Sequence, residues 1–278
     1  MSRHTDASSH AAARTPSVLR RIPPGIWALG LVSMLMDTSS EMIHAMLPVY
    51  LVGALGASAL ADGVIEGIAE STAAITKVFS GALPDCLGRR KLLLAIVYGL
   101  AASTKPVFPL ASMLGWGVAA RFADRIGKGI RGAPRDALIA DITPSEVRGA
   151  SFGLRQALDS AGAVLGPVLA IVAVGAFAGN VRMALWIAVI PAVLCVTLIL
   201  FGVEDRAARS EVKRKAIVIA DLRRLDRRFA AVCGIASLMT LARFSEAFLV
   251  LRAQSVGASN TAVPLVMVGM SVVYTLFA

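Results

Sequence analysis

The sequence is poor in charge, in aromatic residues and in the side chains that usually hold metals. Charged residues make up 17% of the 278 residues and aromatic residues 6%, with three cysteines and three histidines. Hydrophobic residues reach 56%, and the mean hydropathy is +0.72. This balance excludes an ordinary soluble domain and predicts an all-α polytopic membrane protein.

The few cysteines also exclude several kinds of chemistry. Cys86, Cys195 and Cys233 lie far apart without metal or redox spacing, so we expect no disulfide framework, no metal site and no cofactor. The glycines of 124–129 lack the following hydroxyl residue and the preceding strand of a phosphate loop. No nucleophile elbow or paired His-Glu metal helix is present either. The sequence therefore does not predict an enzyme.

The formal net charge of +10 comes from basic residues that cluster outside the long apolar runs. Orientation in a membrane, with the basic segments on the cytoplasmic side, accounts for them, so no nucleic-acid partner is expected. Residues 1–24 are expected to form a disordered cytoplasmic tail. Asp6 and the long first apolar run argue against the alternative of a transit peptide.

Apolar runs predict six membrane crossings before a polar linker. Each is close to or longer than the roughly 20 residues that a bilayer requires. The predicted crossings are 25–55, 60–83, 92–113, 114–133, 151–174 and 184–203.

The segment 114–133 is the least apolar of the six, and a hydropathy window would reject it. The uncharged connection 112–117 predicts an external position and the cation-rich segment 135–148 a cytoplasmic one, so the chain must cross between them. Arg121, Arg125, Lys128 and Arg135 recur at helical spacing, and we expect one charged stripe that faces a watery cavity or a partner helix. The alternative is a re-entrant third run with this whole segment in the cytoplasm.

A polar, basic segment at 204–228 has the composition of a cytoplasmic connector between two bundles. A seventh crossing is predicted at 229–256, and an eighth begins near Ala262. This last run stays apolar to Ala278, whereas a polar flank usually follows a crossing. We therefore expect a truncation after the start of the eighth helix.

A charged hairpin between the second and third runs carries the most specific pattern. Its members are turn-forming glycines, one acid and two cations: Gly81, Asp85, Gly88, Arg89 and Arg90. The cations immediately before an apolar run predict a cytoplasmic edge. The spacing resembles the loop signature between the second and third helices of the major facilitator superfamily of secondary transporters.

Two further segments are similar to the same family. Gly162, Gly166 and Pro167 in the fifth run resemble the motif of its antiporters. Small residues four positions apart, such as the two glycines, let helices approach closely. Arg121 stands where the family carries a characteristic arginine in its fourth helix.

The resemblance implies a fold, a location and a mode of action. The fold is an N-terminal six-helix bundle of two inverted three-helix repeats at 25–203, the linker 204–228, and the first one or two helices of a second bundle at 229–278. The location is a bacterial cytoplasmic (inner) membrane, with the N-terminus in the cytoplasm. Alternating access would expose a midplane site for a small-molecule substrate to each side of the lipid bilayer in turn.

Acidic residues inside the first run are the leading candidates for proton coupling. Asp37 and Glu41 are four residues apart on one helical face, and an acid within a membrane helix is by default a functional hypothesis. Burial favours the neutral acid, whereas Arg121 nearby would favour the charged form, which supplies a switchable balance. The alternative is an acid that serves helix packing or lies at an interface. His44 is a candidate proton relay or a hydrogen-bonded structural residue.

The second and third runs contribute further charged candidates. Glu66, Glu70 and Lys77 predict an internal ion-pair ladder, with cavity lining as the alternative. Lys105 could attract an anionic substrate or snorkel to the outer interface.

Two more candidate groups complete the predicted site. Asp124 and Arg125 join Arg121 as candidate cavity residues of the fourth run. The family resemblance implies that Asp85, with Arg89 and Arg90, acts as a cytoplasmic latch.

Together these patterns predict a secondary transporter that exports a small molecule in exchange for protons, with the Gly-Pro motif favouring export. The first alternative is a proton-coupled uptake permease. The second, from a different class, is an inactive truncated fragment or an assembly partner that needs another chain to complete its cavity.

Overall fold

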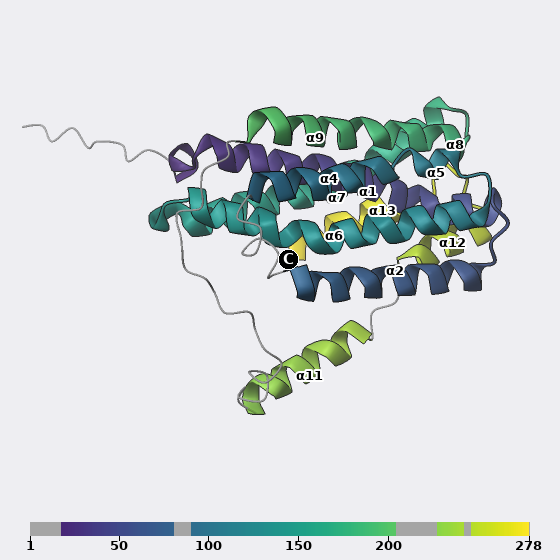
Figure 1. The fold of residues 1–278 in the computed structure, drawn as a ribbon. Helices are drawn as coiled ribbons and strands as arrows, with labels where there is room; N and C mark the ends of the chain where they lie inside the picture. Colours follow the sequence, from purple (N-terminus) through teal and green to yellow (C-terminus); the bar gives the residue numbers. More distant parts are fainter. Residues whose placement is uncertain (1–17, 81–89, 204–226, 242–245, 278) are drawn as a thin grey trace, which may run out of the picture.

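The computed structural model describes residues 18–80, 90–203, 227–241 and 246–277, and within these ranges every regular element is helical (Figure 1). The expected all-α architecture is confirmed. The main helices are α1 (Pro24–Gly53), α2 (Ala59–Ser80), α4 (Arg90–Thr104), α6 (Leu114–Ile142), α7 (Arg148–Ala176), α9 (Val189–Gly202), α11 (Arg227–Leu241), α12 (Ala247–Ser255) and α13 (Leu265–Phe277).

Short elements connect several of these helices. A 3₁₀ turn, η1 (Val18–Arg21), precedes α1, and η2 (Ser145–Val147) joins α6 to α7. The one-turn helix α5 (Val107–Leu110) continues the course of α4. The sixth predicted crossing consists of α8 (Val181–Ala184), η3 (Leu185–Ala188) and α9 in direct succession.

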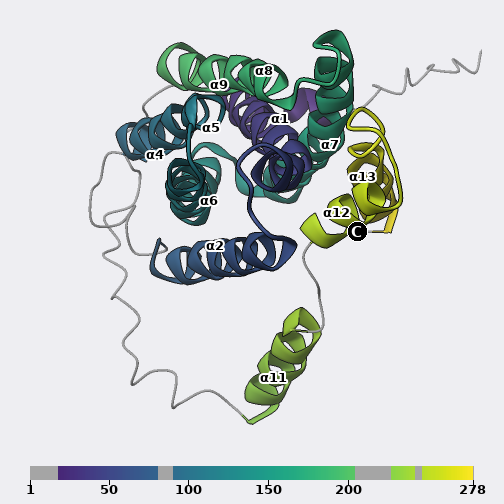
Figure 2. The same ribbon diagram turned by 90° about the vertical axis from the view of Figure 1, so that its right-hand side faces the viewer.

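Helix α1 lies at the centre of the bundle (Figure 2). It packs most extensively against α7 and α9 and also contacts α12. α6 packs against α2 on one side and α4 on the other, and α4 reaches α9. The two ends of the bundle are called the Pro24 end and the Gly53 end, after the first and last residues of α1.

Two apolar clusters fill the bundle around α1. Toward the Gly53 end, residues such as Met46 and Tyr50 pack against α7 and the segment 181–188. Toward the Pro24 end, residues such as Ile26 and Met36 pack against α4, the end of α6, and α9. The polar middle of α1, with Asp37 and Glu41, lies between these clusters along the helix.

The structure corrects the expected end of the fourth crossing. α6 does not stop at Ala133 but continues through Pro134 to Ile142. The sequence placed Arg135 both on the charged stripe and at the start of a cytoplasmic connection, and the structure shows it as a buried residue of this helix. Because α6 packs between α2 and α4 along the bundle, the crossing interpretation holds, and the re-entrant alternative is not supported.

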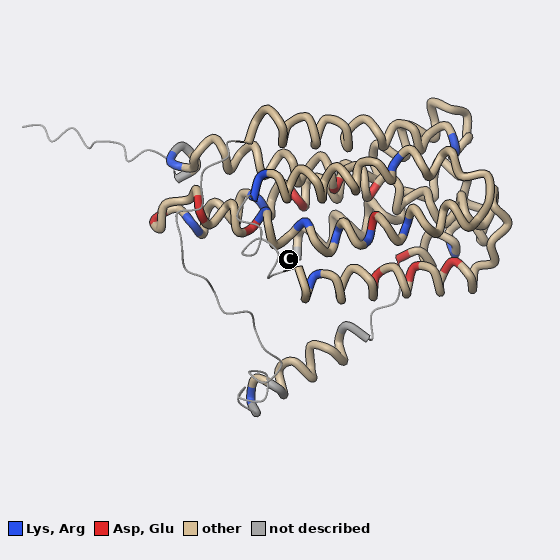
Figure 3. Tube along the Cα trace, viewed as in Figure 1, with Lys and Arg blue, Asp and Glu red and all other residues tan. Residues whose placement is uncertain are grey.

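Charge and apolar surface are distributed in the opposite way to a soluble protein. Arg121, Arg125 and Lys105 are at most 1% exposed, whereas Phe201 of α9 is 86% exposed and Val172 of α7 is 61% exposed. Figure 3 shows charged residues along α2 and α6, while α9 is almost free of them. Buried charge with an apolar exterior is the pattern of a protein whose solvent is lipid.

Three of the described stretches are long and apolar enough to cross a membrane: 90–110, 145–176 and 181–202. A shorter apolar helix covers 265–276. The other long helices, α1, α2 and α6, carry more polar or charged residues, so their place in the bundle is defined by packing.

The predicted seventh crossing, 229–256, corresponds to α11 and α12, with 242–245 outside the described residues. α11 lies apart from the bundle in both Figure 1 and Figure 2, and its described side chains are exposed. α12 packs against α1 and α2, and α13, in the region of the predicted eighth crossing, packs against α7. Most of the predicted linker, 204–226, lies outside the described residues.

The glycines of the fifth-run motif lie where α7 meets α1. A methyl group added at Gly162 would come within 2.6 Å of the carbonyl oxygen of Met34. One added at Gly166 would come within 2.6 Å of the Glu41 Cβ and 2.9 Å of the Thr38 carbonyl oxygen. Only glycine permits this approach of the two backbones, as expected for small residues four apart. α7 continues as one helix through Pro167.

We predict that Gly166→Ala destabilises the bundle by about 1–3 kcal/mol, because the new methyl group must displace α1 backbone. Gly153→Ala on the same helix is the matched control. An added Cβ there meets nothing within 4 Å, so the change is expected to stabilise α7 by about 0.5–1 kcal/mol. Unfolding in detergent, followed by circular dichroism, measures both. Equal stability of the two variants would contradict the packing argument.

Candidate functional site

A stripe of cationic side chains on α6 forms the central part of the candidate site. Arg121, Arg125, Lys128, Arg131 and Arg135 follow one another along the helix from the Gly53 end toward the Pro24 end. Each one faces a carboxylate or a polar side chain of a neighbouring helix, so the predicted stripe toward partner helices is confirmed.

Arg121 forms the contact nearest the Gly53 end. Its Nη2 donates to Glu66 Oε2 of α2 at 2.5 Å and lies 2.8 Å from Nδ1 of His44 on α1. The side chains of Arg121 and Glu66 are 1% and 2% exposed, so this is a fully buried ion pair. The sequence placed Arg121 near Asp37 or Glu41, but its described partners are Glu66 and His44.

One turn further along, Arg125 donates from Nη1 to Glu70 Oε1 of α2 at 2.8 Å. The expected ladder of Glu66, Glu70 and Lys77 is corrected, because the two glutamates of α2 pair with cations of α6, in Arg121–Glu66 and Arg125–Glu70. Lys77 instead lines the cavity described below.

Lys105 and Asp124 form a second fully buried contact. Lys105 Nζ lies 2.7 Å from Asp124 Oδ1 and 3.0 Å from Ser40 Oγ of α1, and the residue is 0% exposed. Both expectations for Lys105, snorkelling to the outer interface and attraction of an anionic substrate, are wrong. Lys105 lies at the break between α4 and α5. Its contacts with Ser40 and Asp124 connect this break to α1 and α6.

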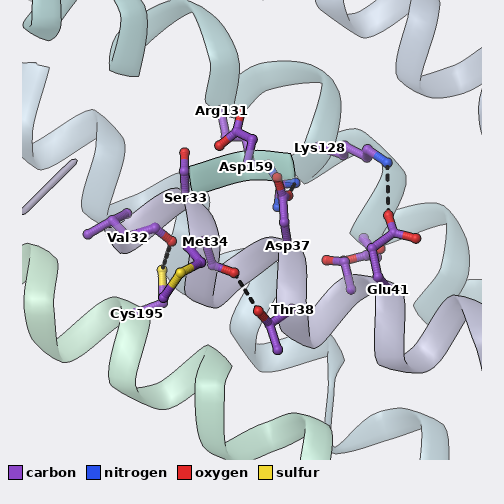
Figure 4. A network of polar contacts seen from close by, with 12 residues as sticks. Val32, Ser33, Met34, Asp37, Thr38, Glu41, Lys128, Arg131, Asp159 and Cys195 are labelled. Carbon is purple, nitrogen blue, oxygen red and sulfur yellow. Dashed lines mark hydrogen bonds and ion pairs between the residues drawn. The ribbon is translucent and has the colours of Figure 1, made fainter. Parts of the chain in front are cut away.

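The two acids of α1 face different cations of α6 (Figure 4). Asp37 accepts a hydrogen bond from Arg131, whose guanidinium also lies 5.8 Å from the ring centroid of Tyr98. Glu41 Oε1 lies 3.8 Å from Lys128 Nζ, and these two side chains are 18% and 37% exposed. The Glu41–Lys128 pair is therefore wider than the contacts of Arg121 and Arg125 with α2, and both of its members are partly exposed.

Toward the Pro24 end, α7 supplies an acid that sequence reasoning missed. Asp159 accepts from Arg155 Nη1 at 2.8 Å and lies 3.6 Å from Arg135 Nη1. Arg135 also donates to Ser33 Oγ of α1, and Asp136 lies 3.2 Å from Arg135 Nε. The four-residue spacing of Arg155 and Asp159 was a helical ion-pair signal in the sequence.

These side chains surround a cavity of about 620 Å³ between α1, α2, α6 and α7. Its wall combines acids and bases with small residues such as Ala73, Ala74 and Ala163, and none of its described lining residues is aromatic. Asp37, Glu41 and Glu70 are among the lining residues, whereas Arg121, Asp124 and Arg125 are not. The predicted site residues thus divide into cavity lining and a buried support behind it.

The hairpin motif is only partly visible. Gly81, Asp85, Gly88 and Arg89 lie outside the described residues, so the predicted latch stays a prediction. Arg90, the first residue of α4, donates to Asp141 and, at 3.0 Å, to the carbonyl oxygen of Ala137. It therefore ties the start of α4 to the end of α6.

Comparisons with known proteins agree with this architecture. The family model of the Major Facilitator Superfamily matches residues 29–278. An uncharacterized MFS-type transporter of Methanocaldococcus jannaschii is 31% identical over 236 residues, which are 84% of this chain and 58% of the relative. Another, from Bacillus subtilis, is 26% identical over 156 residues, or 53% of this chain and 36% of the relative. The chain thus spans about half the length of the curated relatives it matches.

Solved structures show the same fold at low sequence identity. A D-xylose-proton symporter superposes with a TM-score of 0.64 at 16% identity, over 91% of this chain and 66% of that one. A peptide transporter in complex with sulfate gives a TM-score of 0.58 at 15% identity, over 79% of this chain and 45% of that one. With the family match over 29–278, these likenesses establish a multi-pass membrane chain of a transporter family, not an enzyme, and the chain belongs to the Major Facilitator Superfamily.

Proposed function

We propose that the protein is a secondary active transporter that exports a small polar molecule by alternating access in exchange for protons. The observation that carries this proposal is Glu41, which faces the cavity across a 3.8 Å gap from Lys128. A carboxylate in a tight buried pair holds its charge, whereas one in a loose and partly exposed pair can exchange a proton with cavity water. Glu41 is therefore the coupling acid, and Asp37 the acid that holds Arg131.

The contact between Glu41 and α7 supports coupling of protonation to movement. Gly166 packs directly against the Cβ of Glu41. A change in how Glu41 pairs with Lys128 therefore acts at the interface between α1 and α7, not at a free surface. The antiporter-like motif Gly162, Gly166 and Pro167 forms this interface, which favours export over uptake.

The wall of the cavity indicates the class of substrate. Apart from Gln156, which is polar, its larger described side chains are charged, and its small apolar residues are alanines. Apolar ligands usually occupy pockets with aromatic and large aliphatic walls. The carried molecule is therefore a small hydrophilic compound with ionisable groups.

Domain organisation and location belong to the same proposal. Residues 25–203 form one rocking bundle, 204–228 the linker, and 229–278 the beginning of a second bundle, with 1–24 as a tail. The basic composition of the tail and linker favours their placement in the cytoplasm of a bacterial cell. The Pro24 end of the bundle then faces the cytoplasm.

We predict that Glu41→Gln abolishes proton movement coupled to solute. Proteoliposomes with an entrapped pH-sensitive dye would be challenged with a panel of zwitterionic and anionic metabolites, for the chain alone and for the chain continued with a second bundle. Glu146→Gln, at an exposed residue of η2, is the control and should retain the response. Inward or outward solute gradients distinguish uptake from export. Solute-driven proton flux in the Glu41→Gln variant would refute the assignment.

We further predict that Arg131→Gln lowers the free energy of unfolding by about 3–5 kcal/mol, because it leaves Asp37 without its cation in a largely buried position. The double variant Asp37→Asn with Arg131→Gln should recover most of this loss, since no uncompensated charge remains. Equilibrium unfolding in detergent measures the four members of the cycle. Strict additivity of the two changes would mean that the pair does not stabilise the bundle.

A further inference from the structure

Asp62 is a buried acid that the site described above does not use. It lies in the first turn of α2, at the Gly53 end of the bundle, and its residue is 0% exposed. Within the part of the chain that the structure describes, neither carboxylate oxygen has a hydrogen-bond partner. An ionised carboxylate without a partner is very costly away from water, whereas the neutral acid is much less so.

The charges around Asp62 do not supply a cation of its own. Glu66 lies one helical turn further along α2, where side chains four residues apart are neighbours. Arg121 is already paired with Glu66 at 2.5 Å and contacts His44. Asp62 therefore lies one helical turn from the carboxylate that binds Arg121.

Helix α12, which packs against α2, brings an apolar neighbour to this position. The ring of Phe248 lies against Gly63, next to Asp62 in the chain. The ionisable residues of this segment are Glu246 and Arg252, and the Arg252 guanidinium lies 3.5 Å from the hydroxyl of Ser255 on its own helix.

Arg121 has spare donors for a second carboxylate. Among the described residues, its buried Nε and Nη1 have no acceptor, and Nε2 of His44 has no partner. Unpaired donors on Arg121 and unpaired acceptors on Asp62 therefore flank the same carboxylate, because Glu66 binds Arg121 and follows Asp62 by one helical turn. Such groups are rare in folded proteins and call for an explanation.

We propose that Asp62, Glu66 and Arg121 form a proton-binding site at the Gly53 end of the bundle, separate from the cavity, and that Asp62 carries the proton. One proton is shared by the two acids. When this proton moves from Asp62 to Glu66, the Arg121 guanidinium moves from the Glu66 carboxylate to the Asp62 carboxylate. The net charge of the three residues is therefore unchanged. None of the three residues lines the cavity.

The position of this site gives it a role in coupling, and this role rests on the proposed function. Glu70 follows Glu66 by one turn on α2, pairs with Arg125 and lines the cavity. The ladder therefore links the proton site to the cavity wall. Because the Gly53 end faces outward in the proposed orientation, the site receives protons from outside.

Infrared spectroscopy of the purified protein tests the site without any substrate. We predict that the spectrum at neutral pH contains a C=O stretch of a protonated carboxylic acid that Asp62→Asn removes. The band should shift in heavy water, as expected for an exchangeable proton. Glu146→Gln, at an exposed acid, is the matched control and should leave this band unchanged. An unchanged band in the Asp62→Asn variant would overturn the proposal.

Thermal stability gives a second readout. Asparagine has nearly the same shape as the neutral acid, so the melting temperature of Asp62→Asn at neutral pH should match that of the wild type. Glu66→Gln, which removes the partner of Arg121, should lower the melting temperature markedly. A comparable fall, or failure to fold, in Asp62→Asn would mean that Asp62 is ionised and would refute the proposal. Because neither measurement involves transport, their outcome is independent of the proposed transport function.

Discussion

The cost of placing charge inside a membrane is the constraint on which this structure depends. α6 carries a row of arginines and lysine through the bundle, and each must meet an opposite charge or a polar group. Carboxylates on α1, α2 and α7 meet this requirement. Since these partners come from three helices, the ion pairs define the rotation of α6 and the position of its neighbours at the same time.

The sequence predicted most of the helical architecture, because long apolar runs and the spacing of small residues are local signals. It misplaced the end of α6, because Arg135 was interpreted as part of a solvated connection although it is buried beside Ser33. Ion-pair partners on different helices were beyond sequence reasoning. The pairing of Asp37 with Arg131 and of Lys105 with Asp124 depends on which helices are neighbours and at what height, and composition does not contain that information.

The closest helix packing and the two acids of α1 occur at the same part of that helix. The glycines of α7 press against the helical turn that carries Asp37 and Glu41, and the opposite side of that turn faces α6. A rigid interface of backbone against backbone thus lies next to the partly exposed pair of Glu41 and Lys128. Close-packed helices move as units, so a local change in pairing is transmitted to whole helices and not absorbed by side chains.

The pairing of charges along α6 also has an electrical consequence. Each buried cation of this helix travels with a nearby carboxylate when the helices move together. Membrane voltage does work only on net charge that moves through the field, about 2.3 kcal/mol per elementary charge per 100 mV. A bundle built from neutral pairs therefore presents little net charge to the membrane potential, so voltage has little direct effect on the relative positions of its helices.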